Sequence, residues 1–454
     1  MSLSRRSFLG WTLGIGAGAV AARLFDAPRA RAATTYSGPL LFGIHASGGW
    51  DPLFFTDPKE SAELNRVTQA VGQVGNIRFA DAPIDPVAFG YDAQYSAAYS
   101  ERLLSNRTFF ERHGARTTVL NGVDTRTNNH DTGTRYVWSG KSEIGHPAIG
   151  ALVAAMGGSI SGGHADGPPL AFLSTGGYDY PGGLVPLSRA SSSGSMKKLM
   201  FPNAIDATKP ADASYHAGFA ADAIARAQAA RMNAQAGQAT LPTVQRALAE
   251  LAGARASMGE LSALDIPPLV DLPGNNLEDV QSLMQTTQIA LASMKAGLTL
   301  AASMSYSGFD THGNHDRDMV VRITKLLGAI DFVISEAERQ GLSERLVIFV
   351  GSDFGRGPYY NGTATSSGKD HWSTTTNLVI VPPSQASQFG NRVIGGTTDA
   401  VRARKVAPGS LQVDDQGMPL TPLTVHQGLR KLLGVDGSAG ATRYPLANDP
   451  IALF

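Results

Sequence analysis

The sequence contains no cysteine among its 454 residues. This absence excludes disulfides, zinc–thiolate sites, iron–sulfur clusters and thiol catalysis, because each of these needs a cysteine sulfur. Any metal ion bound by this chain must therefore be held by imidazole nitrogens or by oxygen ligands from Asp, Glu, Asn or water.

The sequence also lacks a surplus of either charge. It has 38 basic and 38 acidic side chains, and charged residues make up only 17% of the chain. Nucleic-acid binding through bulk electrostatics requires a basic surplus or a clustered basic face, so we expect no nucleic-acid partner. The 51 glycines instead indicate many loops, the segments that commonly carry binding and catalytic side chains.

The sequence also lacks long apolar runs beyond its N-terminal segment. In that remaining part of the chain, no stretch approaches the ~20 apolar residues of a transmembrane helix. Residues 4–9 carry the twin arginines Arg5 and Arg6, an apolar Gly/Ala-rich run follows at 8–22, and Ala30-Arg31-Ala32 forms a small-x-small site. This pattern is typical of a twin-arginine signal peptide over residues 1–32, with an ordinary membrane anchor or general secretory signal as the alternative. We expect a periplasmic or secreted mature protein, without a membrane span, from about Ala33.

Short apolar runs that predict strands alternate with longer segments of helical period. The predicted strands are 39–46, 117–120, 170–173, 301–306, 345–350 and 377–381. The predicted helices are 130–138, 145–156, 215–262, 277–296, 318–340 and 421–433. The alternation predicts an α/β protein, a three-layer α/β/α sandwich with a largely parallel central sheet.

No linker clearly divides the chain, so residues 33–454 are expected to form a single domain. Residues 174–212 are rich in Gly, Ser and Pro and show no period, which predicts a long loop that lies over the site. Together with the Ala-rich helical segment that follows, they predict an insertion around residues 174–275.

Polar side chains follow several of the predicted strands, where ligands bind in sheets of this kind. Asp370 and His371 precede a strand and join the others only if their loop folds back. Such a set suits divalent Ca, Mg, Mn or Zn, and two ions ~4 Å apart would polarise a phosphoryl or sulfuryl oxygen. The candidate metal ligands are Asp51, Asp310, His312, His315, Asp353, Asp370 and His371.

Four motifs resemble those of a known family. Residues 48–51 (GGWD), 309–312 (FDTH), 352–356 (SDFGR) and 370–372 (DHW) are similar to motifs of the bacterial domain-of-unknown-function family DUF1501. Members of that family are typically exported by the twin-arginine route and belong to the alkaline phosphatase/sulfatase-like superfamily. The resemblance implies an alkaline-phosphatase-like fold and a site for hydrolysis of phosphate or sulfate esters.

The resemblance also implies metal-binding roles. It matches Asp51 to the first-strand acid, Asp353 to the acid after a later strand and His371 to the late histidine ligand of the superfamily. It matches Asp310 to the acid of an Asp–His pair, with His312 or His315 as the histidine. The superfamily has a histidine directly after the later acid, whereas this chain has Phe354, so Asp370 would have to supply the missing ligand.

The residue at the nucleophile position differs further from the superfamily pattern. The superfamily places Ser, Thr or Cys at the start of the helix after the second strand. In this chain the corresponding positions fall at Asn129 and His130, and Thr125 is a nearby hydroxyl. The cysteine-derived formylglycine of typical sulfatases is excluded by composition. Arg356 offers a fork for an anion, with a surface role as the alternative, so the catalytic candidates are Thr125, Asn129, His130 and Arg356.

The sequence is compatible with two functions. The first is an exported metal-dependent hydrolase that acts on a small anionic ester or glycan. The second is a catalytically inactive superfamily member that serves as a binding or assembly protein outside the cytoplasm, with another exported protein as its partner.

Overall fold

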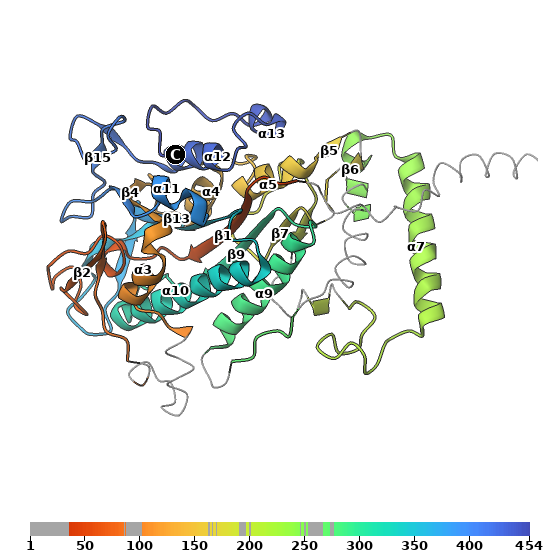
Figure 1. The fold of residues 1–454 in the computed structure, drawn as a ribbon, viewed down its shortest axis with the longest axis horizontal. Helices are drawn as coiled ribbons and strands as arrows, with labels where there is room; N and C mark the ends of the chain where they lie inside the picture. Colours follow the sequence, from red (N-terminus) through yellow and green to blue (C-terminus); the bar gives the residue numbers. More distant parts are fainter. Residues whose placement is uncertain are drawn as a thin grey trace, which may run out of the picture.

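Figure 1 shows the computed structural model, which describes most of the chain from Tyr36 to Phe454. The predicted signal peptide, residues 1–32, lies outside the described residues. Within 36–454 the description omits residues 86, 88–101, 162–163, 166, 169, 190–196, 199–200, 246, 249–250, 253–266 and 273–276.

An eight-stranded sheet forms the centre of the molecule. Its strands lie in the order β14 (Arg392–Gly395), β4 (Thr117–Asp124), β13 (Thr374–Ile380), β10 (Leu346–Ser352), β1 (Leu40–Ser47), β9 (Ala301–Ser307), β7 (Phe172–Ser174) and β8 (Leu187–Arg189). Every neighbouring pair is parallel except the two pairs made by β13, which runs antiparallel to β4 and β10. Strands covered on both faces read as continuous apolar runs, which is why β10 was evident from the sequence.

Helices cover both faces of this sheet, as Figure 1 shows. One layer contains α3 (Asn106–His113), α9 (Glu278–Lys295) and α10 (His315–Gln340). The other contains α4 (His130–Ser139), α5 (Ile149–Ala154) and α12 (Pro422–Leu432). The predicted three-layer α/β/α sandwich with a largely parallel sheet is therefore confirmed.

The antiparallel direction of β13 places the start of that strand at the carboxyl edge of its parallel neighbours. The hairpin of β11 (Gly355–Tyr360) and β12 (Lys369–Trp372) directly precedes β13, so it returns the chain to this edge. The segment that carries Asp370 and His371 therefore folds back to the carboxyl edge. This was the condition for these two residues to join the site.

The remaining elements are short and lie around the sheet. Paired strands are β2 (Val71–Val74) with β3 (Ile77–Ala80), β5 (Ile160–Ser161) with β6 (His164–Ala165), and β15 (Lys405–Val406) with β16 (Met418–Pro419). Short α-helices are α11 (Ala386–Phe389) and α13 (Ala439–Arg443), and 3₁₀ turns lie at Pro52–Phe54, Gly114–Arg116, Ala155–Gly157 and Pro383–Gln385.

The described part of the segment predicted as an insertion includes the helix α7 (Gly218–Gln238), none of whose side chains is buried. In Figure 1 this helix stands apart from the sheet and its covering layers. The loop predicted at 174–212 needs a correction, because β8 lies within it and pairs with β7 at the edge of the sheet. Three residues with two polar side chains are too short a pattern to reveal a strand. None of the described helices combines the length and apolarity that crossing a membrane needs.

Candidate metal centre

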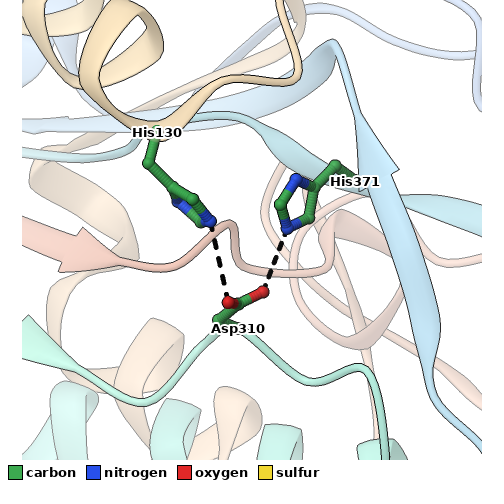
Figure 2. Close-up of side chains that lie close together, drawn as sticks. All are labelled: His130, Asp310 and His371. Carbon is green, nitrogen blue, oxygen red and sulfur yellow. Dashed lines mark hydrogen bonds and ion pairs between the residues drawn. The ribbon is translucent and has the colours of Figure 1, made fainter.

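Three elements bring His130, Asp310 and His371 together at the carboxyl edge of the sheet, as Figure 2 shows. His130 begins α4, Asp310 lies in the loop after β9, and His371 lies on β12. One nitrogen or oxygen from each side chain lies within 4.8 Å of the others.

The His371 ring is oriented by a backbone carbonyl. Its Nδ1 lies 3.0 Å from the carbonyl oxygen of Asn128, which only accepts hydrogen bonds, so we assign the ring proton to Nδ1. In the neutral ring Nε2 then presents a lone pair, and this atom lies 3.0 Å from Asp310 Oδ1. A lone pair facing a carboxylate oxygen is favourable only when a cation or a proton lies between them.

The His130 ring has the same arrangement with a carboxylate as its outer partner. Its Nδ1 lies 2.5 Å from Asp353 Oδ2, and its Nε2 lies 3.6 Å from Asp310 Oδ2. A histidine that donates one ring N–H to a carboxylate or a carbonyl and offers the other nitrogen is the usual arrangement of metal-ligating imidazoles. The hydrogen bond to Asp353 outweighs the effect of burial and raises the pKa of His130.

Both carboxylates of the site are held in the ionised form. Burial acts to raise the pKa of Asp310, but the hydrogen bond and charge of Arg356, together with the nearby His371 and His312 side chains, lower it to about 2. Burial also opposes ionisation of Asp353, yet the bond from His130 and the nearby His45 ring lower its pKa. The backbone N–H of Gly48 donates to both Asp353 oxygens, at 2.9 and 3.2 Å.

Gly48 allows the end of β1 to approach the Asp310 loop. It adopts φ +122, and a Cβ atom at this position would lie 2.3 Å from the backbone nitrogen of Asp310. Phe354, which is 0% exposed, packs its ring against His130 and His371 with centroids 4.7 and 4.5 Å away. The residue in the position where the superfamily has a ligand thus holds two imidazoles in place.

His312 is the histidine that accompanies Asp310. Its Nε2 lies 3.1 Å from Asp310 Oδ1 and 2.9 Å from His371 Nε2, and its Nδ1 lies 3.4 Å from Asp370 Oδ1. His312 therefore supplies a further nitrogen beside the set of three, and Asp370 lies behind it.

Asp51 and His315 lie in a separate, fully buried cluster. Asp51 Oδ2 accepts from Lys369 Nζ at 2.8 Å and lies 3.0 Å from His315 Nε2. Burial acts to raise the pKa of Asp51, but the Lys369 ammonium and His315 lower it. Lys369 Nζ and His315 Nε2 share Asp51 Oδ2, and the Leu53 backbone N–H donates to Oδ1 at 2.9 Å, so the geometry gives Asp51 and His315 a role in an internal ion pair. This differs from the metal-ligand role that the sequence suggested.

Arg356 also has a role that differs from the expected anion binding. Its side chain is 0% exposed and donates to the carbonyls of Gly48, Gly49 and Lys369, and to Asp310 Oδ1 at 2.6 Å. These bonds direct its donors into the framework, so the guanidinium positions Asp310.

Just before α4, the two predicted candidates Thr125 and Asn129 are engaged by neighbouring backbone groups. Thr125 is 2% exposed, and its hydroxyl lies against the carbonyls of Thr127 and Ser373 at 3.1 and 2.8 Å. The Asn129 side chain caps α4 by accepting from the Thr132 backbone at 3.0 Å. The imidazole of His130 therefore stands where the superfamily resemblance implies a hydroxyl nucleophile.

A pocket of about 550 Å³ opens beside the cluster. It is lined by His45, Ser47, Gly48, His130, Asp131, Thr134, Arg135, Gly177, Tyr178, Ser305, Ser307, Gly308, Asp310 and Asp353. Sequence analysis missed His45, Arg135 and Tyr178. Only His45 had a detectable signal, as a polar residue near the end of a strand that is otherwise apolar.

A protein-family model described as "Protein of unknown function (DUF1501)" matches residues 41–381. Among curated proteins, none gives a significant match to the sequence.

Three solved structures illustrate what the fold is similar to. The lipoteichoic acid synthase LtaP from Listeria monocytogenes aligns at 8% identity and a TM-score of 0.32, covering 91% of this chain and 76% of its own. The PsFucS1 sulfatase from Pseudoalteromonas sp. aligns at 11% identity and a TM-score of 0.32, covering 96% and 75%. A mutant of TAB5 alkaline phosphatase with Mg bound in its M3 site aligns at 11% identity and a TM-score of 0.29, covering 78% and 94%.

Proposed function

The chain belongs to the DUF1501 family, and on that premise we propose that it is an exported, metal-dependent hydrolase of phosphate or sulfate esters. One observation carries the proposal. His130 and His371 each engage the outer ring nitrogen with an acceptor and direct Nε2 at the same carboxylate, Asp310. Two lone pairs and a carboxylate within 4.8 Å of one another suit a divalent cation and are unfavourable without one.

The donor set fits a site that retains open coordination positions. His130, Asp310 and His371 would hold the ion, with His312 beside them. Two imidazoles with one carboxylate favour zinc or manganese over calcium and magnesium, which prefer oxygen ligands. A bound ion of this kind acts as a Lewis acid toward an ester oxygen and lowers the pKa of a coordinated water.

The residues of the chain then fix the geometry of the reaction. Asp353 holds the His130 ring, Arg356 holds the Asp310 carboxylate, and Phe354 packs against both imidazoles. Since Thr125, the hydroxyl predicted from the sequence, is buried and bonded to backbone carbonyls, we propose water as the nucleophile. Arg135, which lines the pocket, is placed to face the anionic part of a small ester or glycan substrate.

The test combines metal content with turnover. The purified chain is analysed for bound metal, then assayed on aryl phosphates and aryl sulfates with added Ca, Mg, Mn and Zn. We expect tight binding of zinc or manganese and hydrolysis of one ester class, both lost in His371→Ala. The matched control is His216→Ala, because the His216 side chain is exposed and, among the described residues, only its backbone atoms make hydrogen bonds.

The second candidate is a binding or assembly protein that retains the site without turnover. Phe354 in place of the superfamily histidine and His130 in place of the expected hydroxyl at the first position of α4 favour it. Metal binding without hydrolysis of any ester would support this second candidate. Failure to bind any of the four metals would contradict the proposed metal centre itself.

A further inference from the structure

His45 lies on β1 at the wall of the pocket and belongs to none of the metal-binding residues described above. Its side chain is 2% exposed. The Nε2 atom lies 3.6 Å from Asp353 Oδ1 and 3.5 Å from Thr134 Oγ1. Both distances exceed the 2.9–3.0 Å typical of an N–H hydrogen bond to oxygen, so these two contacts of Nε2 are long.

The other ring nitrogen fixes the proton of His45. Trp138 Nε1 lies 2.9 Å from His45 Nδ1, and both side chains are buried. An indole nitrogen only donates hydrogen bonds, so His45 Nδ1 must accept. A neutral imidazole whose Nδ1 accepts carries its proton on Nε2, the nitrogen that faces Asp353 and the pocket.

We propose that the Nε2–H of His45 donates a hydrogen bond to a tetrahedral oxyanion, phosphate-like or sulfate-like, bound in this pocket. A buried donor ordinarily has a close acceptor, and the oxygen of a bound ligand would approach Nε2 more closely than Thr134 and Asp353 do. Thr134 and Arg135, on the helix that forms the next wall, place further donors around the same space. This inference rests on the proposed function, because it names a contact of that substrate.

His45 thereby differs from the candidate metal ligands by the position of its proton. His130 and His371 donate from Nδ1 and offer Nε2 as a lone pair, whereas His45 accepts at Nδ1 and donates from Nε2. A metal ion needs the lone pair that His45 lacks at this nitrogen. His45 and His130 in the pocket wall and His371 beside it are thus divided between two tasks by their outer partners.

The tautomer is measured by nitrogen-15 NMR of the full chain with labelled histidine, free of metal. We expect the Nε2–H form for His45, and a mixture of both tautomers in Trp138→Phe. Trp50→Phe is the matched control, because Trp50 is equally buried and donates to Thr375 instead. A wild-type His45 that carries its proton on Nδ1 overturns the inference.

Ligand addition tests the role of the donor. Added zinc should move the His130 and His371 signals and leave the His45 Nε2 proton in place, and inorganic phosphate should then shift that proton. His45→Gln, which retains an N–H, should bind phosphate within a few-fold of the wild type, whereas His45→Met should lose about tenfold, the worth of one hydrogen bond to a charged group. Zinc that displaces the Nε2 proton, or a His45 signal unmoved by excess phosphate, overturns the inference.

The failure of the proposed function is distinguishable from the failure of this inference. The proposed function fails when neither metal binding nor turnover is found. In that case phosphate is added to the metal-free chain, and the response of the His45 proton still decides the inference.

Discussion

At the scale of single residues, the partner of each outer ring nitrogen decides what an imidazole of this site can do. Asp353 sets the orientation of His130, and the Asn128 carbonyl sets that of His371. Because Asp353 is a side-chain partner, its contribution to metal binding can be tested by substitution. The chemistry of the site therefore depends on residues that need not touch an ion.

We predict that Asp353→Asn lowers metal affinity by about 10- to 100-fold, the usual cost of losing such a partner. Asparagine keeps the shape but removes the charge that holds His130. Titration calorimetry with zinc measures the change. Asp370→Asn is the control, since Asp370 is 79% exposed and lies 3.4 Å from His312. Equal losses in both variants would contradict the prediction.

The raised pKa of His130 gives two pH dependences of opposite sign. A metal ligand must be deprotonated, so metal affinity should rise as the pH rises through this raised pKa. In the metal-free protein, the stability contributed by the His130–Asp353 pair is fully present below the ordinary pKa of 6.5 and is lost as the pH rises through the folded value. Thermal unfolding and zinc titration at several pH values measure both trends, and His130→Gln should flatten each.

At the scale of elements, the position of His130 depends on close packing of α4 against the end of β10. A Cβ atom at Gly133 of α4 would lie 2.3 Å from the Asp353 carbonyl oxygen. We predict that Gly133→Ala destabilises the fold by about 1–3 kcal/mol, the range for overpacking, and weakens zinc binding. Gly237→Ala on α7 is the control because open space surrounds it, and there alanine should be neutral or stabilising. Denaturant unfolding measures both variants.

The hairpin of β11 and β12 is held by the buried ion pair of Lys369 and Asp51. Removing one member of such a pair leaves a buried charge without its partner, so Lys369→Met should cost about 3–5 kcal/mol of unfolding free energy. His371 lies two residues further along β12, and its position should loosen with the hairpin. The double variant Asp51→Asn with Lys369→Met should recover part of the loss in denaturant unfolding. A loss equal to the sum of the single variants would show that the two groups do not interact.

At the scale of the whole molecule, α7 contributes no buried side chain. Deletion of Gly218–Gln238 should therefore shift the thermal midpoint by only a few degrees and leave zinc affinity unchanged. Differential scanning calorimetry tests this expectation. A large loss of stability would show that α7 is part of the core and that the proposed insertion around 174–275 is integral to the domain.

Local sequence pattern predicted the central strands and the edge of the sheet where polar residues gather. Buried strands such as β1 and β10 are continuous apolar runs, Asp353 directly follows β10, and Asp310 lies in the loop after β9. The rule that polar residues follow strands also selected the loop of His130, as a catalytic candidate, whereas His371 precedes a strand and was included only if its loop folded back.

Only the tertiary structure decided which of these residues act together. The antiparallel course of β13 returned His371 to the carboxyl edge, and the burial of Lys369 beside Asp51 gave that acid an internal partner. His45 needed the indole of Trp138, which lies 93 residues away in sequence, to fix its proton. Each of these outcomes depends on contacts between distant segments, whereas periodicity and composition report only on neighbours in the chain.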